Sequence, residues 1–298
     1  MTTPPRVLAE RVRARAGQTI RRAAGLVEDP PPRCDDPTIA YTPVDGVARV
    51  VHGDLGSMLV GGVASLFVQM LHPLAMAGVA DHSRYREDPF GRLLQTAHFI
   101  SATTYGSRTT AEAALERVRF VHGFVHGTAD DGRPYDARDP RLLTFVHCAE
   151  VSMFLAAYRR LGRYPVTDAD ADRYVAEVAT AARDLGVPDP PTTAAGLAAE
   201  LASFRPELRL SGAAREARDF LVRGVSLGPV ARLAYRVIVR AALALLDEPE
   251  RRILGASRRS WRDGVALRAA RLVAAAVRAV LPPAAPQVVE SPPSTAST

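Results

Sequence analysis

The sequence predicts an all-α protein with a single large multi-helix domain and mostly buried core helices. Hydrophobic residues make up 47% of the 298 residues, charged residues 23% and aromatic residues only 6%. Alanine is abundant and favours helix, whereas strands are richer in β-branched and aromatic residues. Helical periodicity, bounded by caps and by glycine or proline stops, recurs along most of the chain. We expect eight to ten helices.

The domain organisation follows from shifts in composition. Residues 1–36 are predicted to form a basic amphipathic helix and a proline-rich linker, because apolar side chains recur among arginines and a proline run follows. Residues 37–281 form the predicted all-α domain. Residues 282–298 are rich in Pro, Ser, Thr and Ala, and they are predicted to be a disordered tail whose removal leaves stability unchanged.

The stretch Leu55–Ala80 is the longest apolar segment, with Gln69 and His72 as its only strongly polar side chains. Its length would span a bilayer. Internal glycines divide it, and Pro73 prevents an uninterrupted helix. A helix buried on all sides in a large α-helical domain has the same composition. We therefore expect Leu55–Met70 to be buried in protein.

The remaining elements follow from periodicity and caps. Val47–Val51 reads as a strand or a loop, and Thr128–Asp139 reads as a loop. Helices are predicted at Phe90–Ser101, Thr109–His126 with Thr110 as N-cap, Pro140–Leu161, Asp168–Asp184 with Thr167 as N-cap, Thr193–Phe204, Ala213–Arg223, Val230–Leu246 and Arg262–Leu281.

Charge and cysteine usage exclude several classes of function. The net charge is +6 and every basic side chain apart from histidine is arginine, so lysine-dependent chemistry is absent. The arginines are not interleaved with stacking aromatics, so we expect no nucleic-acid partner. Cys34 and Cys148 show no disulfide or metal spacing, and no leader pattern is found at the N-terminus, so a cytoplasmic location is expected. Oligomeric state is left open by the sequence.

Histidines mark where chemistry is expected, because all seven lie between His52 and His147. Imidazole is the commonest metal ligand and the usual proton carrier near neutral pH. His122 and His126 lack the glutamate of a zincin motif, and no di-iron, phosphate-loop, dinucleotide or serine-hydrolase signature is found. His147 is interpreted as a core residue that donates to a backbone carbonyl.

His122 has two readings, as a core residue or as an axial ligand of haem. Arg119 lies one turn before it, His126 is predicted one turn after it, and Arg92 and Thr96 share a face of a neighbouring helix. Arginine forks suit haem propionates. The second reading therefore has local support.

Five segments, in order, resemble the mpaB-type / rubber oxygenase catalytic domain, a family formerly listed as a domain of unknown function. The resemblance runs from about Gly53 to Leu246. It is carried by Leu71–Thr96, Val118–Gly127, Asp131–Tyr135, Asp139–His147 and Asp172–Glu177.

The resemblance implies an all-α haem b oxygenase that uses O₂ and iron on a hydrophobic substrate, unsaturated or isoprenoid-like. In the latex-clearing proteins of this family, a histidine in a Val-Arg-x-x-His context is the proximal ligand, which matches His122. Arg92 and Thr96 match their distal Arg-x-x-Lys-Thr element. Gln95 stands where they have lysine, and His72–Asp81 offers no match to their distal glutamate.

The implied site consists of Arg92, Gln95 and Thr96 as catalytic residues, with His122 as the iron ligand. Arg119, His126 and His72 are the further residues expected to bind the cofactor. Two alternatives stay open. One is a haem- or lipid-binding helical module without turnover, and the other is a cofactor-free helical protein in peripheral contact with a membrane through its basic terminal helices.

Overall fold

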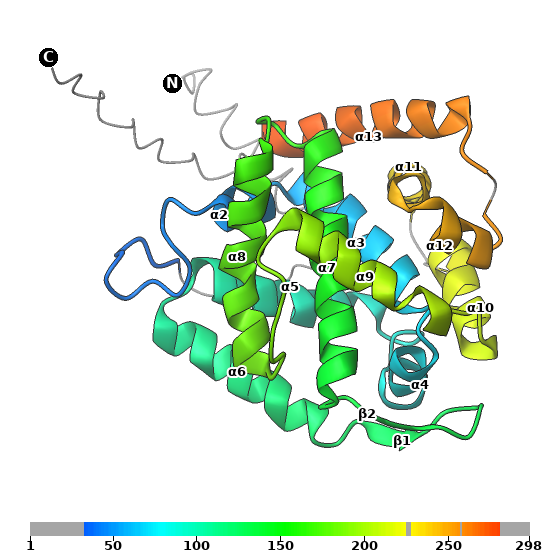
Figure 1. Cartoon of the computed structure of the whole chain (residues 1–298). Helices are drawn as coiled ribbons and strands as arrows, with labels where there is room; N and C mark the ends of the chain where they lie inside the picture. Colours follow the sequence, from blue (N-terminus) through cyan, green and yellow to red (C-terminus); the bar gives the residue numbers. More distant parts are fainter. Residues whose placement is uncertain (1–32, 225–227, 257, 281–298) are drawn as a thin grey trace, which may run out of the picture.

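The computed structural model describes residues 33–280 except 225–227 and 257, without the side chains of 89–94, 224, 229–230 and 280. The predicted N-terminal helix and C-terminal tail lie outside this range. Within it the protein is all-α, with twelve α-helices and one two-stranded hairpin (Figure 1). The elements are α2 (Val47–His52), α3 (Leu55–Gln69), α4 (Pro73–His82), α5 (Pro89–Tyr105), α6 (Arg108–His122), β1 (His126–Thr128), β2 (Pro134–Asp136), α7 (Pro140–Leu161), α8 (Asp168–Leu185), α9 (Ala194–Ser203), α10 (Gly212–Asp219), α11 (Pro229–Leu245), α12 (Glu248–Ile253) and α13 (Trp261–Val280).

The long apolar segment forms two helices, α3 and α4. The Asp54 side chain caps α3 by accepting from Ser57 N at 3.1 Å, and Pro73 starts α4. No single helix in the described range is long and apolar enough to cross a membrane. By length and composition, α3 and α4 together meet that criterion as a pair bent by 107°.

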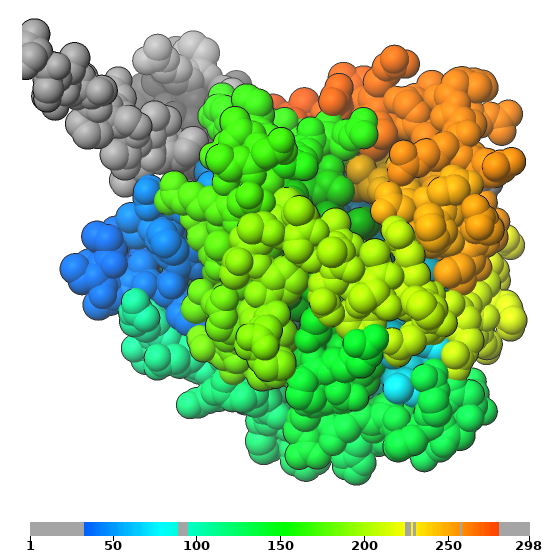
Figure 2. Space-filling model, in the orientation of Figure 1, coloured from blue at the N-terminus to red at the C-terminus, as the bar shows by residue number. Residues whose placement is uncertain are grey.

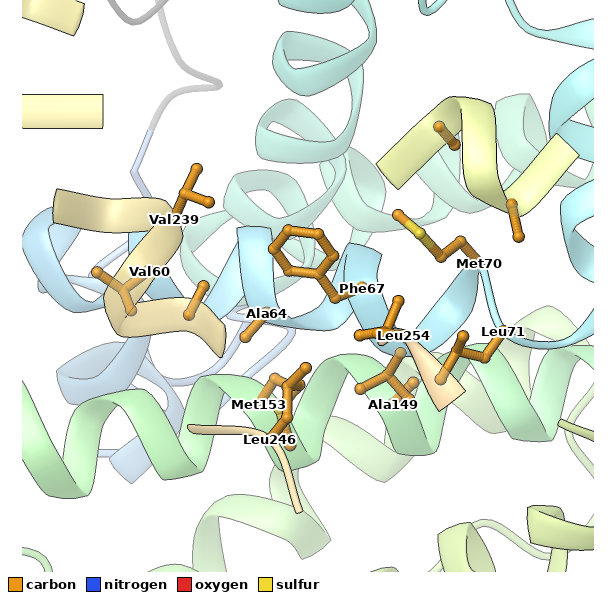
Figure 3. Packing of buried hydrophobic residues seen from close by; sticks show 14 of the residues in the cluster. Val60, Ala64, Phe67, Met70, Leu71, Ala149, Met153, Val239, Leu246 and Leu254 are labelled. Atoms are coloured by element: carbon orange, nitrogen blue, oxygen red, sulfur yellow. The ribbon is translucent and has the colours of Figure 1, made fainter. Parts of the chain in front are cut away.

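Helix α3 lies at the centre of the main core, where it contacts α7, α11 and α13. Val60, Ala64 and Phe67 of α3 pack against Ala149 and Met153 of α7 (Figure 3). All five are buried, with Ala64, Phe67 and Ala149 completely inaccessible to solvent. Fully burying a side chain of this kind stabilises the fold by about 1.5–3 kcal/mol.

Glycines set how closely the neighbours of α3 approach. A Cβ atom at Gly56 would lie 2.6 Å from the Cα and Cβ atoms of Ala274 in α13, and one at Gly61 would lie 3.0 Å from the Met153 carbonyl oxygen in α7. At Gly62, one residue further along, the nearest atom would be 3.9 Å away. Gly56 and Gly61 are therefore required for packing, whereas Gly62 is not.

A second core joins α2, α7, α8 and α9. Val47–Val51 was expected to be a strand or a loop, and that prediction is wrong. The Glu177 carboxylate of α8 accepts from the backbone N–H groups of Val47 at 3.2 Å and Ala48 at 2.8 Å. These are among the groups that a helix N-terminus leaves unpaired. A distant residue thus caps α2 and overrides the strand preference of its valines.

The helices from α7 onward follow the sequence prediction closely. The bounds of α7 match it, Thr167 and Asp170 form a capping box on α8, and Gly186 ends α8 with φ +109°. Helix α10 ends earlier than expected because a π-helical turn, Phe220–Gly224, follows it. The short helices α2 and α12 raise the count above the expected eight to ten.

The glycine contacts predict opposite effects for two matched substitutions in α3. Gly56→Ala should lower the free energy of unfolding by about 1–3 kcal/mol, because the new methyl group meets the α13 backbone. Gly62→Ala should be neutral or raise it by up to about 1 kcal/mol, because alanine is the better helix former and has space. Urea unfolding followed by circular dichroism measures both. Equal effects at the two positions would contradict the packing argument.

Candidate functional site

The candidate residues of the sequence are carried mainly by α5 and α6, a consecutive pair joined at Gly106 and Ser107 (Figure 1). The expected N-cap Thr110 is wrong. Ser107 caps α6, and its hydroxyl accepts from Thr110 N at 3.2 Å. Arg92 and His122 are equidistant along the chain from Ser107, and both are helical. The two helices contact each other, and a close approach of Arg92 to His122 stays a prediction.

On α5, the two candidates with described side chains differ in exposure. Gln95 is exposed, whereas Thr96 is half-buried. The helix is longer than expected, because it continues to Tyr105. Arg92 is in its first turn, and its side chain lies outside the described part of the chain. The shared face predicted for Arg92 and Thr96 follows from their four-residue spacing within one helix.

His122 is the last residue of α6 and is half-buried. The large apolar side chains around it in sequence are exposed: Phe120 by 69%, Val121 by 49% and Phe124 by 63%. The rings of Phe120 and Phe124 meet edge to face, with centroids 5.1 Å apart. An imidazole at the surface end of a helix is thus flanked by apolar groups in contact with solvent.

Arg119 connects α6 to α8. Its Nη1 donates to the carbonyl oxygen of Asp184 at 2.7 Å, and the residue is otherwise exposed. That carbonyl belongs to the last turn of α8, where helical carbonyls lack intrahelical partners. The contact fixes the C-terminal turn of α6 against the end of α8, and a role of Arg119 toward a cofactor stays a prediction.

His126 is not one helical turn beyond His122, as expected, because α6 ends at its C-cap Gly123. His126 lies in β1, where it pairs with Asp136 of β2 and is exposed. The predicted loop Thr128–Asp139 thus contains part of a hairpin, whose turn includes Gly132 at φ +82°. Strand pairing therefore moves His126 out of the register that the helical spacing assumed.

The hairpin is fastened to α4 by Tyr135. Its hydroxyl donates to Asp81 at 2.5 Å and lies 3.2 Å from His82 Nε2, which also lies 3.2 Å from the His126 carbonyl oxygen. Burial and the bond to Asp81 raise the pKa of Tyr135 to about 12. A side chain at Gly127 would collide with the same hydroxyl. These residues, which belong to the segments that resemble the family, hold the hairpin in place.

His72 is only 1% exposed and stands at the N-cap of α4. Its ring packs on Phe145 and Phe204, with centroids 4.9 and 6.3 Å away. The Nε2 atom is 3.4 Å from Glu207, an ion-pair distance without the geometry of a hydrogen bond. Burial lowers the pKa of His72, and Glu207 opposes that shift. These contacts favour a structural role for His72 at the start of α4, and its expected role in binding the cofactor stays a prediction.

His147 is a residue whose environment the sequence did not reveal. The expected bond to a backbone carbonyl is not formed by Nε2, which is buried without a hydrogen-bond partner among the described residues. Burial, with a smaller effect of Arg183, lowers the pKa of His147 to about 4. Leu143, one turn before His147 in α7, lies beside Gly186 at the end of α8, and Arg119 of α6 contacts Asp184 at the same end. The imidazole is therefore neutral at physiological pH.

His52, in contrast to His147, has a hydrogen-bond partner at each ring nitrogen. Its Nδ1 lies 2.8 Å from the Thr104 hydroxyl and its Nε2 lies 3.0 Å from the Tyr174 hydroxyl. It thereby joins α2, α5 and α8, and burial lowers its pKa to about 4. In the same segment as Tyr174, Asp172 accepts from Ala194 N at 2.8 Å and caps α9. The segment Asp172–Glu177 is thus a set of structural contacts.

The remaining donor chemistry is that of isolated imidazoles. Within the described residues, no group of three or more His, Cys, Asp or Glu side chains is arranged to hold a metal ion. Such an arrangement suits a cofactor that takes a single protein nitrogen, and it does not provide the three or four ligands of a zinc site.

A family model for the catalytic domain of ER-bound oxygenase mpaB/B′ and rubber oxygenase matches residues 49–294. The chain belongs to this family. The resemblance stated from the five segments is therefore confirmed. The family's name describes an oxygenase catalytic domain, and α2 to α13 all fall within the match, apart from the first two residues of α2. Comparison with curated proteins and with solved structures gave no match.

The histidine pKa values predict how the stability of this mpaB-family domain depends on pH. The unfolded chain binds protons at His52 and His147 near pH 6.5, whereas the folded chain excludes them until about pH 4. Stability should therefore be full above pH 6.5 and should fall between pH 6.5 and 4. Each histidine adds a slope that approaches about 1.4 kcal/mol per pH unit.

Urea unfolding at a series of pH values measures this slope. His52→Gln should reduce the slope relative to the unmodified protein, because the proton that His52 takes up on unfolding is lost from the balance. If the free energy of unfolding falls with the same slope in both proteins between pH 6.5 and 5, His52 does not have the lowered pKa given above.

Proposed function

We propose that this chain is a b-type haem-dependent oxygenase that acts with O₂ on a hydrophobic substrate, unsaturated or isoprenoid-like. The oxygenase activity is inferred from the family, whose name is that of an oxygenase catalytic domain. The observation that supports haem binding is the half-buried His122 at the end of α6, a helix that contacts α5, on which Arg92 and Thr96 lie.

The donor set fits haem. Haem iron takes one axial imidazole from the protein, so it requires no cluster of ligands. A ligating imidazole must be neutral. Burial lowers the pKa of His147 to about 4, so its imidazole is neutral, and its buried Nε2 has no hydrogen-bond partner among the described residues. We keep His122 as the axial ligand and treat His147 as the alternative.

The residues then divide by role. His122 would hold the iron, and Arg92 and Thr96 would donate hydrogen bonds where charge develops during the reaction. Bound haem would supply the oxygen chemistry itself. Gln95 is a neutral amide and is exposed, so we assign this donation to Arg92 and Thr96. Arg119 would neutralise a propionate.

The apolar side chains beside His122 indicate the class of substrate. Phe120, Val121 and Phe124 present uncharged surface next to the imidazole. Large exposed apolar groups that gather at one place mark binding surfaces rather than ordinary solvent-facing positions. An alkene or isoprenoid chain would bury this surface without leaving a polar group unpaired.

A second candidate is a haem- or lipid-binding module without turnover. Gln95 in place of a cation, and the lack of a glutamate in His72–Asp81, favour it. The third alternative, a cofactor-free protein at a membrane surface, is favoured by exposed apolar residues on the basic helix α13. We also propose a cytoplasmic location with peripheral membrane contact, consistent with the free thiols of Cys34 and Cys148.

An absorption spectrum of haem-reconstituted protein tests the axial ligand. His122→Ala should abolish the Soret band while the far-ultraviolet circular dichroism stays nearly unchanged, because His122 is the last residue of α6 and its replacement leaves the rest of the helix intact. His126→Ala, on the exposed strand β1, is the matched control and should retain the band. Loss of the band in His147→Ala but not in His122→Ala would identify His147 of α7 as the ligand.

Oxygen uptake separates the oxygenase from the module without turnover. Arg92→Ala should keep the Soret band and lower oxygen uptake with an unsaturated lipid by about 10²–10³, the usual cost of removing one donor to a developing charge. Thr96→Val, which keeps shape and removes the hydroxyl, should lower it in the same direction. Haem binding without any oxygen uptake in the unmodified protein would favour the module.

A further inference from the structure

Helix α13 carries a stripe of large apolar side chains that face solvent. Trp261 is 75% exposed, Val265 47% and Leu272 75%. Positions four and eleven residues apart fall on one face of a helix, and Arg268 lies between them on that face. We call Trp261, Val265, Arg268 and Leu272 the α13 face.

The opposite side of α13 accounts for its place in the fold. Ala270, Ala274 and Val277 are buried there, where the helix contacts α3, α7 and α11. The residues of the α13 face therefore take no part in packing the core. Packing inside this protein does not explain the apolar residues of this face, because about half or more of the surface of each one is exposed to solvent.

The charge around the α13 face has one sign. Arg262, Arg268 and Arg271 are exposed, and the guanidinium of Arg262 lies 5.8 Å from the centre of the Trp261 ring. Asp263 is the only acidic residue between Trp261 and Val280. It turns inward to Arg251, 3.3 Å away, and accepts from Ser260 N. No carboxylate of the helix thus offsets the exposed arginines.

The α13 face is separate from the candidate cofactor residues. Figure 1 shows α13 along the upper edge of the molecule, whereas α6 and the hairpin lie along the lower edge. Figure 2 shows α13 on the rim of the same view, in orange to red. The two exposed apolar surfaces, the α13 face and the phenylalanines of α6, can therefore be tested independently.

We propose that the α13 face docks onto the surface of a membrane that contains anionic lipid. A helix with apolar residues on one side, flanked by arginines, lies in the interface with its apolar side inserted. The indole of Trp261 prefers this boundary, because one part of it is apolar and its N–H is polar. A second copy of the chain would bring arginines against arginines, so self-association fits the charge poorly. The proposal deepens the peripheral membrane contact of the proposed function and requires no haem.

Trp261 is the only tryptophan in the chain, so it reports docking directly. The full-length protein would be titrated with vesicles of phosphatidylcholine and phosphatidylserine, and with vesicles of phosphatidylcholine alone. We expect a blue shift of Trp261 fluorescence and co-flotation with the first kind only. Both effects should be lost at high salt, because salt screens the attraction between arginine and lipid.

Variants that keep Trp261 locate the surface. Arg262→Gln and Arg268→Gln should each weaken binding roughly fivefold, and Leu272→Gln roughly tenfold or more. The double variant Phe120→Gln/Phe124→Gln removes comparably exposed apolar groups at the other edge and should bind like the unmodified protein.

Three results would overturn the proposal. They are equal binding to vesicles without anionic lipid, loss of binding in the phenylalanine variant but not in the α13 variants, and a dimer by light scattering in which Trp261 fluorescence is already blue-shifted. None of these readouts depends on haem or turnover. Docking without haem binding would leave this inference standing and reject the oxygenase, and the reverse result would do the opposite.

Discussion

The contact between α3 and its three neighbours is the constraint on which the rest of the structure depends. Helix α3 can approach α13 and α7 closely only because Gly56 and Gly61 have no side chain at the points of contact. Their positions fix α7, and α7 in turn carries His147 toward α8 and Phe154 toward His52. The same contact leaves the other side of α13 outside the core. Packing at one apolar helix thus determines the place of α7 and the side of α13 that faces solvent.

Helix α8 is the second organising element, and its contacts explain what the segment Asp172–Glu177, which resembles the family, does in the fold. Asp172 caps α9, Tyr174 binds His52, and Glu177 caps α2. Each contact satisfies a backbone or imidazole group that would otherwise be buried unpaired, a loss worth about 1–3 kcal/mol. The other end of α8 holds α6 through Arg119. Residues that resemble a catalytic family in sequence can therefore serve the frame around the site.

The sequence predicted what local interactions decide. The bounds of α7 and α8 follow from Pro140, Thr167 and Gly186, all of which act within a turn of themselves. It failed where a distant group decides. Val47–Val51 is helical because Glu177 reaches it across the second core, and His126 left the helical register because β1 pairs with β2. The unsatisfied Nε2 of His147 is likewise a property of surroundings that no spacing of residues along the chain records.

The candidate site is best understood by comparing the buried histidines. His52 and His147 both have pKa values lowered to about 4 by burial, so both are neutral at physiological pH. His52 has hydroxyl groups at both ring nitrogens, so its burial is compensated and its role is structural. Nε2 of His147 and both ring nitrogens of His72 have no hydrogen-bond partner among the described residues, and an uncompensated buried polar atom is costly. Helix α6 reaches the C-terminal end of α8 through Arg119, and Leu143 of α7 lies beside Gly186 at the same end. The end of α8 thus positions both the helix that carries His122 and the helix that carries His147.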